Sequence, residues 1–266
     1  MRNFDGSNLH RYLSTADETS DEVKNKQPEI LLLASECVDL IHQLIQASET
    51  NTAAKSLATN SLFIYMAGIR TALSGHAAAV SIPLRTSLES ACYALLVARD
   101  ERLVEIWQSR HKSETDLKAQ KKAFGAAVSS AAAVISEIDD DAATLIKSLY
   151  EAAIDFGGHP NPRAMHGHIT TNENNGELVD YGCLYGWGRY IGGSLIQCVE
   201  FGIAISILIA ATVENQPLFL PDSKVFGDLM SLKNHYAEQI NGSPIQYNQD
   251  MYNKLDKTWE PLFKPD

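Results

Sequence analysis

The chain has 266 residues, of which 45% are hydrophobic and 21% charged, so it can bury a large core and has the composition of a folded globular protein. Its formal net charge of −11 argues against non-specific binding to DNA or RNA, which needs a basic surface. The four cysteines are scattered without a CxxC pair, and the first ten residues lack the apolar run of a secretory signal, so we expect a cytoplasmic protein.

Helical periodicity dominates the first half of the chain. Residues 1–27 are polar and charged, and we expect a flexible arm or a short irregular helix there. From Pro28 onward, apolar residues recur at helical spacing. They predict helices over 28–48, 52–79, 81–99, 101–111, 113–135 and 139–157, with a capping box at Ser113 and an acidic start at Asp139 that suits the helix dipole.

The segment 81–99, SIPLRTSLESACYALLVAR, has no solvated face at helical spacing and is typical of a helix buried on all sides. Arg85 and Glu89 are its exceptions, and their spacing places them on one side of the helix. Two interpretations stay open. The pair is either an ordinary surface ion pair at a subunit edge or a buried pair that builds a site, because burying an unpaired charge is costly.

The second half of the chain begins with a long non-helical stretch, residues 159–186, in which Asn174-Asn175-Gly176 predicts the turn of a small β-hairpin. Residues 191–213 are long and apolar enough to span a bilayer. Gln197 and Glu200 lie in the middle and no Lys/Arg cluster flanks the segment, so we expect a buried bundle helix and no membrane insertion. Further helices are expected over 222–240 and 248–259.

Together these patterns predict an all-α fold, a bundle of about seven to nine helices with a loop or hairpin insertion around 159–186. Residues 28–266 form one domain behind the N-terminal arm, and we expect a homo-oligomer. Polar side chains concentrate in the insertion, where His159, His166 and His168 lie near Asp155, Asn161 and Arg163. Long loops in compact domains often carry function.

Two short motifs, Pro83-Leu-Arg-Thr-Ser-Leu-Glu-Ser-Ala91 and His159-Pro-Asn-Pro-Arg-Ala164, resemble a group of bacterial all-helical proteins near the HEPN-like superfamily, across roughly residues 60–215. That superfamily includes RNases, which carry an Arg-x4–6-His motif, and nucleotide-binding proteins. The spacing occurs at Arg163–His168, where Ala164 replaces the polar residue that usually follows the arginine, and again at Arg70–His76.

The resemblance implies metal-independent phosphodiester chemistry on RNA or a nucleotide. Arginine would hold the phosphate and histidine would move the proton. The catalytic candidates are Arg85, Glu89, His159, Arg163 and His168. The ligand-binding candidates are Asn161, Arg70, His76 and Tyr185, the last as a surface on which a base could stack.

Two other hypotheses remain. In one, His166 and His168 bind a divalent metal, with His159 or Asp155 as the third ligand; no other cofactor is expected. In the other, the polar network is structural, and the chain is a non-catalytic ligand-binding or dimerisation module. The sequence does not decide between an enzyme and a binding protein.

Overall fold

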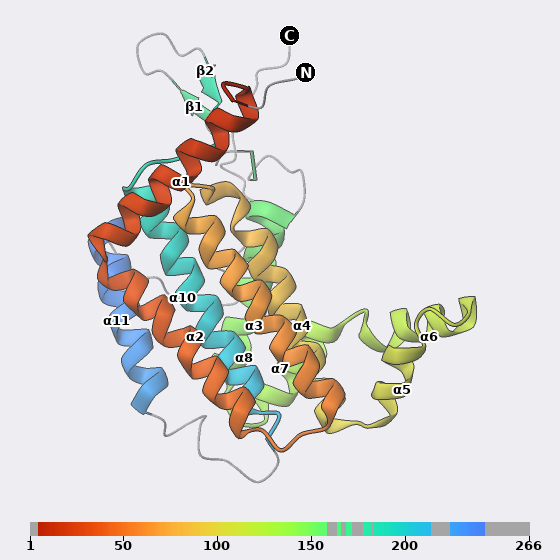
Figure 1. Cartoon of the computed structure of the whole chain (residues 1–266). Coiled ribbons are helices and arrows are strands. Elements are labelled where there is room, and N and C mark those ends of the chain that lie inside the picture. Colours follow the sequence, from red (N-terminus) through yellow and green to blue (C-terminus); the bar gives the residue numbers. More distant parts are fainter. Residues whose placement is uncertain are drawn as a thin grey trace, which may run out of the picture.

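The computed structural model describes residues 5–158, 164–165, 169–171, 178–181, 183–213 and 224–242, and it confirms the predicted all-α helical bundle (Figure 1). In chain order its helices are α1 (Asn8–Lys26), α2 (Glu29–Ala47), α3 (Thr52–Leu73), η1 (Ala77–Ala79), α4 (Ser81–Arg99), α5 (Arg102–Ser109), α6 (Glu114–Phe124), α7 (Ala127–Ser136), α8 (Asp140–Ala153), η2 (Ile154–Gly158), α10 (Arg189–Ala210) and α11 (Lys224–Asn241).

Helix α10 lies at the centre of the bundle. It contacts α2, α3, α4, α8 and α11, and Figure 1 shows it enclosed by these helices. From Ile191 to Ala210 every residue is buried except Gly193 and Gln197. Among the described helices, α2 and α10 are long and apolar enough to cross a membrane, and 89% of the apolar window of α10 is buried inside the protein.

Helix α4 has the predicted boundaries but not the predicted environment. Its most extensive contact is with α3, and Leu84, Leu88 and Leu95 are buried. A narrow stripe reaches the surface, with Ile82 and Thr86 exposed. The expectation of a helix buried on all sides is therefore wrong for α4, whereas α10 comes close to it. Both helices are apolar, and only packing determines which of them is central.

Side-chain caps explain several helix starts. Ser113 accepts from the Asp116 backbone N–H at 3.1 Å, as the capping box predicted, and Asp139, expected only as part of an acidic start, caps α8 by accepting from the backbone N–H groups of Asp141 and Ala142. Asn51 caps α3, and its amide also donates to the Val97 carbonyl at 3.0 Å, which ties α3 to the end of α4. Near Gly125 the helix expected over 113–135 divides into α6 and α7.

Two other expectations differ from the structure. Most of the N-terminal segment is not a flexible arm, because Asn8–Lys26 form a regular helix capped by Ser7. The helix expected over 52–79 ends at Leu73, because the chain turns at Gly75, which has a φ of +84°. A β-carbon at this glycine would lie 2.5 Å from the Tyr185 carbonyl oxygen, so the turn needs glycine for both reasons.

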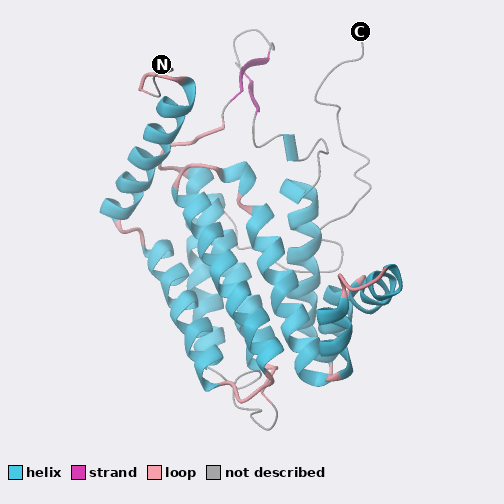
Figure 2. Ribbon diagram, turned by 45° about the vertical axis from the view of Figure 1, so that its right-hand side comes forward, coloured by secondary structure: helices cyan, strands magenta, loops and turns pink. Residues whose placement is uncertain are grey.

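The predicted hairpin is present as strands β1 (Ile169–Thr171) and β2 (Leu178–Tyr181), which pair antiparallel with Ile169 opposite Tyr181. Figure 2 shows the hairpin beyond one end of the bundle. The expected turn at 174–176 and the expected helix over 248–259 lie outside the described residues. Helix α8 continues into the π-type turn η2 rather than ending in a simple glycine cap.

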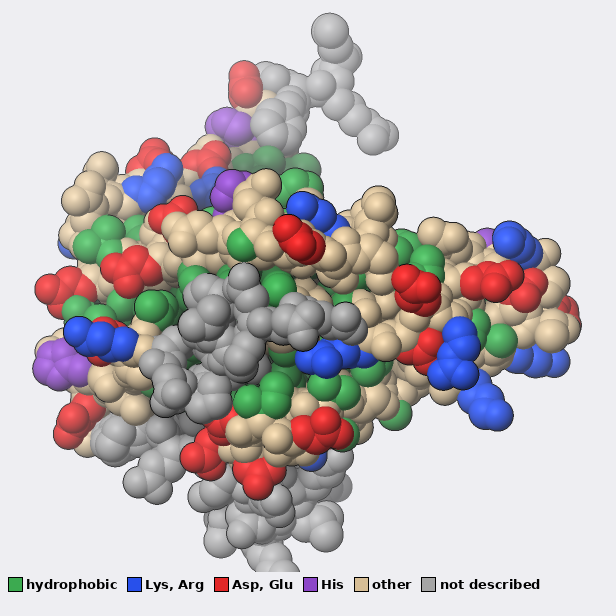
Figure 3. Space-filling view, turned by 90° about the horizontal axis from the view of Figure 1, so that it is seen from below, with side chains coloured by type: hydrophobic (Ala, Val, Ile, Leu, Met, Phe, Trp, Pro, Cys, Tyr) green, Lys and Arg blue, Asp and Glu red, His purple; other side chains and the backbone are tan. Residues whose placement is uncertain are grey.

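Helices α5 and α6 project sideways from the bundle, and the projecting arm bears acidic and basic side chains (Figure 3). Aromatic stacking anchors the arm, because the rings of Tyr93 on α4 and Phe124 on α6 lie 4.4 Å apart, centroid to centroid. Of the cysteines, Cys37, Cys92 and Cys198 are buried and Cys183 is exposed. Burial raises the pKa of the Cys37 thiol to about 12, so this thiol is inert at neutral pH.

Candidate functional site

The described candidate residues fall into two groups. Arg85 and Glu89 lie on α4, whereas Arg70, His76 and Tyr185 meet near the turn that follows α3. The other candidates, His159, Asn161, Arg163, His166 and His168, lie outside the described residues. Among the residues that the structure does describe, no group of three or more His, Cys, Asp or Glu side chains could hold a metal ion. The histidine metal site therefore stays a prediction.

Arg85 and Glu89 form a partly buried ion pair with a third partner. Arg85 Nε donates to Glu89 Oε1 at 3.0 Å, and 24% and 35% of the two side chains are exposed. Arg85 Nη2 donates to the Tyr150 hydroxyl on α8 at 3.3 Å, and its guanidinium carbon lies 5.1 Å from that ring's centroid. Burial alone would lower the pKa of Arg85, but Glu89 and Tyr150 outweigh burial and raise it. The pair is intermediate between the two predicted environments.

Glu89 also faces a pocket between α3, α4 and α5, which we call the Glu89 pocket. Its volume is about 530 Å³, within the roughly 300–1,000 Å³ typical of small-molecule sites. It is lined by Ser56, Leu57, Asn60, Thr86, Glu89, Ser90, Tyr93 and Trp107. Tyr93 and Trp107 supply aromatic surface, and Glu89 is the charged group among these residues. Arg85 does not line the pocket and holds Glu89 from outside it.

The serine and threonine hydroxyl groups of the Glu89 pocket donate hydrogen bonds to backbone carbonyls. Ser56 donates to Thr52 at 2.8 Å, Thr86 to Ile82 at 3.1 Å, and Ser90 to Leu57 at 2.9 Å. Each oxygen therefore presents lone pairs, because a hydroxyl has one hydrogen and two acceptor sites. The pocket's hydroxyls are acceptors.

The amide and the carboxylate continue this pattern. Asn60 Nδ2 donates to Ser90 Oγ at 3.0 Å, which leaves Asn60 Oδ1 as an acceptor. Glu89 Oε1 accepts from Arg85, and within the described part of the chain no hydrogen bond uses Glu89 Oε2. The Glu89 pocket thus presents one carboxylate and several acceptor oxygens, beside the Trp107 indole N–H, the Tyr93 hydroxyl and the second amide hydrogen of Asn60.

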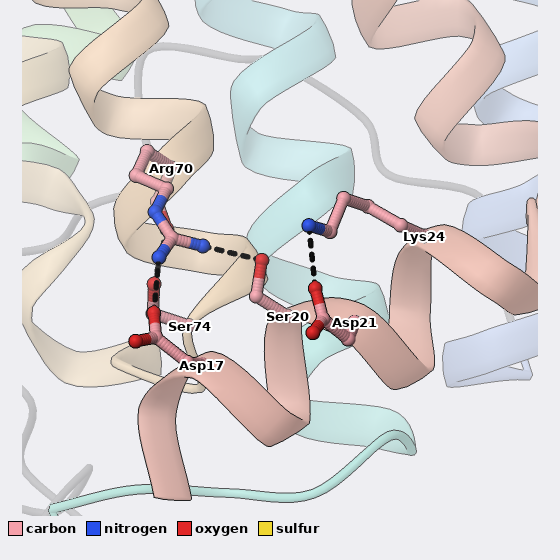
Figure 4. Close-up of polar contacts among 6 residues, drawn as sticks. All are labelled: Asp17, Ser20, Asp21, Lys24, Arg70 and Ser74. Atoms are coloured by element: carbon pink, nitrogen blue, oxygen red, sulfur yellow. Dashed lines mark hydrogen bonds and ion pairs between the residues drawn. The ribbon is translucent and has the colours of Figure 1, made fainter. Parts of the chain in front are cut away.

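The second group begins with Arg70, which ties α3 to α1. Its guanidinium donates to Asp17 Oδ1 at 2.6 Å and also to Ser20 Oγ (Figure 4). In Figure 4 both acceptors lie on α1, beside the separate Asp21–Lys24 ion pair. Because Asp17 and Ser20 occupy the guanidinium, Arg70 holds the N-terminal helix in this conformation.

His76 lies just beyond, at the start of η1. Its Nε2 is hydrogen-bonded to the Tyr12 hydroxyl of α1, and the two rings meet edge to face with centroids 5.4 Å apart. Within the described residues its Nδ1 is buried and has no hydrogen-bond partner. Burial and the charge of Arg70 lower the pKa of His76, so the imidazole is neutral at pH 7.

Tyr185 joins this group through its backbone. Its N–H donates to the Gly75 carbonyl at 2.9 Å, next to His76, which docks the segment after the hairpin onto the α3 turn. The Tyr185 ring stacks on Tyr190 with centroids 4.3 Å apart. The sequence singled out Arg70, His76 and Tyr185 separately, and the tertiary structure brings their backbones into one region.

A third polar site was not predicted. Glu200 on α10 and Lys233 on α11 form an ion pair with Oε1 and Nζ 3.4 Å apart, and their side chains are 8% and 0% exposed. The sequence indicated Glu200 only as a charge inside an apolar helix, and Lys233 carried no signal. A buried glutamate needs a partner, and the polar helix over 222–240 was the place to search for one.

Comparison with protein-family models, curated proteins and solved structures finds no match for this chain. The HEPN-like resemblance, the homo-oligomeric state and the cytoplasmic location therefore stay predictions.

Proposed function

We propose that this protein is a ligand-binding helical bundle whose Glu89 pocket takes a small organic cation, such as a protonated amine or a guanidine. The observation that carries the proposal is the acceptor arrangement of Ser56, Asn60, Thr86 and Ser90 around the Glu89 carboxylate. An ammonium or guanidinium group brings donors and no acceptors, and so complements such a surface.

The remaining walls favour the same ligand class. Tyr93 and Trp107 provide aromatic surface, which attracts cations through the ring quadrupole. The net charge of −11 also raises the local concentration of cations around the molecule. A carboxylate ligand would meet Glu89 and a row of acceptor oxygens, so the pocket selects against it.

Isothermal titration calorimetry with butylamine, putrescine and agmatine tests this proposal, with butyrate as the matched acid. We expect the amines to bind and butyrate to give no heat. Glu89→Gln should weaken amine binding about tenfold or more, because it removes the charge and keeps the shape. Glu36→Gln makes the same charge change on an exposed face of α2 and should bind as wild type does. Equal affinity of wild type and Glu89→Gln would refute the proposal.

The phosphodiester chemistry implied by the HEPN-like resemblance is a second candidate function. The observation that favours it is that the turn after α3 brings His76 close to Arg70; burial and the charge of Arg70 lower the pKa of His76, which favours the neutral imidazole that can accept a proton. Arg70 would have to leave Asp17 and Ser20 to reach a phosphate. Incubating wild type, His76→Ala and the exposed control His42→Ala with a mixed RNA pool tests this candidate. Loss of cleavage in His76→Ala alone supports it, and any other outcome rejects it for this residue.

A further inference from the structure

A second cavity lies on the other side of α4, between the start of that helix, the end of α8 and the first half of α10. Its volume is about 330 Å³, at the small end of the range for ligand sites. Ala164, the residue after Arg163, contributes to its wall. The described lining consists of Ala77, Ala78, Ser81, Leu149, Ala152, Phe156, Ala164, Arg189, Tyr190, Gly193, Ser194, Gln197 and Glu200. We call it the α10 cavity.

Helix α10 supplies a polar stripe to this cavity. Gly193 and Gln197 are the residues between Ile191 and Ala210 that are not buried, and both line it. Gln197 Nε2 donates to Ser81 Oγ at 2.8 Å, which leaves Gln197 Oε1 as an acceptor. Ser194 Oγ donates to the Tyr190 carbonyl at 2.9 Å and likewise presents lone pairs. These groups suit a donor on the ligand.

The buried ion pair lies at the inner end of this stripe. Glu200 lines the cavity, whereas its partner Lys233 is fully buried on α11. The carboxylate therefore adds negative charge on the cavity side, with a compensating cation behind it. A buried pair of this kind costs desolvation energy, and Lys233 keeps the Glu200 carboxylate charged at the cavity wall.

Arg189 gives the outer part of the cavity the opposite charge. Its side chain is exposed, and it makes no ion pair or hydrogen bond with any other residue in the ranges that the structure describes. A guanidinium can bind a carboxylate through two parallel hydrogen bonds. Phe156 and Tyr190, both about half exposed, also line the cavity. The cavity thus has a cation at one end of α10 and acceptors with a carboxylate further along the same helix.

We propose that the α10 cavity binds a small zwitterion of the amino-acid class, with its carboxylate on Arg189 and its ammonium group at Gln197, Ser194 and Glu200. The site is separate from the Glu89 pocket and does not depend on the cation proposed there. The two differ in selectivity, because among the described lining residues Arg189 brings a cation to the α10 cavity and no cationic side chain lines the Glu89 pocket.

Gly193 allows a sharp test. A β-carbon at this position would meet no heavy atom within 4 Å, so Gly193→Leu places a side chain in the cavity without a backbone clash. The substitution also removes a glycine from a helix interior, so the melting temperature should stay the same or rise. Gly227→Leu is the matched control, because Gly227 lies on α11 in equally open space.

The experiment measures thermal shift and calorimetric binding for each proteinogenic L-amino acid, with acetate and methylamine as half-ligands. We expect at least one amino acid to bind wild type and Gly227→Leu, and neither half-ligand to bind at the same concentration. Gly193→Leu should abolish binding, and Arg189→Met should weaken it tenfold or more, whereas Arg11→Met, an exposed control, should not. Absence of binding by every amino acid, equal binding of acetate, or undiminished binding by Gly193→Leu would each overturn the proposal.

Discussion

Lys233 Nζ lies 3.4 Å from Glu200 Oε1 across the contact between α11 and α10, and neither side chain is more than 8% exposed. Burial lowers the pKa of Lys233, and Glu200 opposes this by favouring the charged ammonium. Each ion is therefore tolerated in the core because the other is present. The pair connects the central helix to the last described helix, so it links the α10 cavity to the docking of α11.

Replacing one partner of this pair should lower the free energy of unfolding far more than replacing both partners. Lys233→Met leaves Glu200 buried without its ammonium partner, and we expect the free energy of unfolding to fall by about 3–5 kcal/mol. The double variant Glu200→Gln with Lys233→Met should recover most of that loss, since no buried ion remains. Urea unfolding of the two single variants and the double variant measures the coupling. Lys24→Met, which breaks the exposed Asp21–Lys24 pair, is the control and should change stability little.

The neutral state of His76 predicts a pH dependence. Its pKa is lowered in the folded protein from the ordinary value of 6.5, so folding favours the unprotonated ring. The stability this contributes is fully present above pH 6.5, and it is lost progressively as the pH falls from 6.5 toward the folded pKa. Between about pH 8 and pH 5, wild type should lose more unfolding free energy than His76→Gln. His42→Gln should follow wild type, and identical pH profiles for all three proteins would contradict the burial of His76.

Gly75 and Gly242 separate backbone strain from steric clash. Both have positive φ, +84° and +80°, but a β-carbon would lie 2.5 Å from the Tyr185 carbonyl oxygen at Gly75 and near nothing at Gly242. Gly242→Ala should cost about 1–2 kcal/mol for the left-handed conformation alone. Gly75→Ala should cost more, and hydrogen exchange should show faster exchange of the Tyr185 amide, which bonds to the Gly75 carbonyl. Equal losses of unfolding free energy at the two positions would mean that residues 183–188 shift to relieve the clash at little energetic cost.

The Arg85–Glu89 pair should matter more for binding than for folding. Its side chains are 24% and 35% exposed, so water screens the ion pair, and Glu89→Gln should lower the unfolding free energy by less than about 1 kcal/mol. A fully buried pair would respond much more strongly. A thermal melt of Glu89→Gln, alongside its amine titration, distinguishes the two. A large fall in melting temperature would place the pair in the core and assign Glu89 a structural role.

Local patterns in the sequence predicted much of the fold. The boundaries of α4, the cap at Ser113 and the acidic start of α8 at Asp139 were correct, because periodicity and helix-start signals depend on residues a few positions apart. The end of α3 was placed too late, because it depends on the contact between Gly75 and Tyr185, far apart along the chain. Between an arm and a short irregular helix the sequence left residues 1–27 undecided because they are polar, and the contacts that α1 makes with the bundle, such as Arg70–Asp17, join residues far apart along the chain.

The sequence by itself determined that this is an all-α bundle and that Arg85, Glu89, Arg70 and His76 are unusual. These conclusions follow from residue type and short-range spacing. Only the tertiary structure decided that α10 and not α4 is central, that Glu89 faces a pocket of acceptors, and that Lys233 balances Glu200. Each of these depends on which helices, far apart in the sequence, pack against each other. Helical periodicity shows which face of a helix is apolar, but it does not show which helix packs on that face.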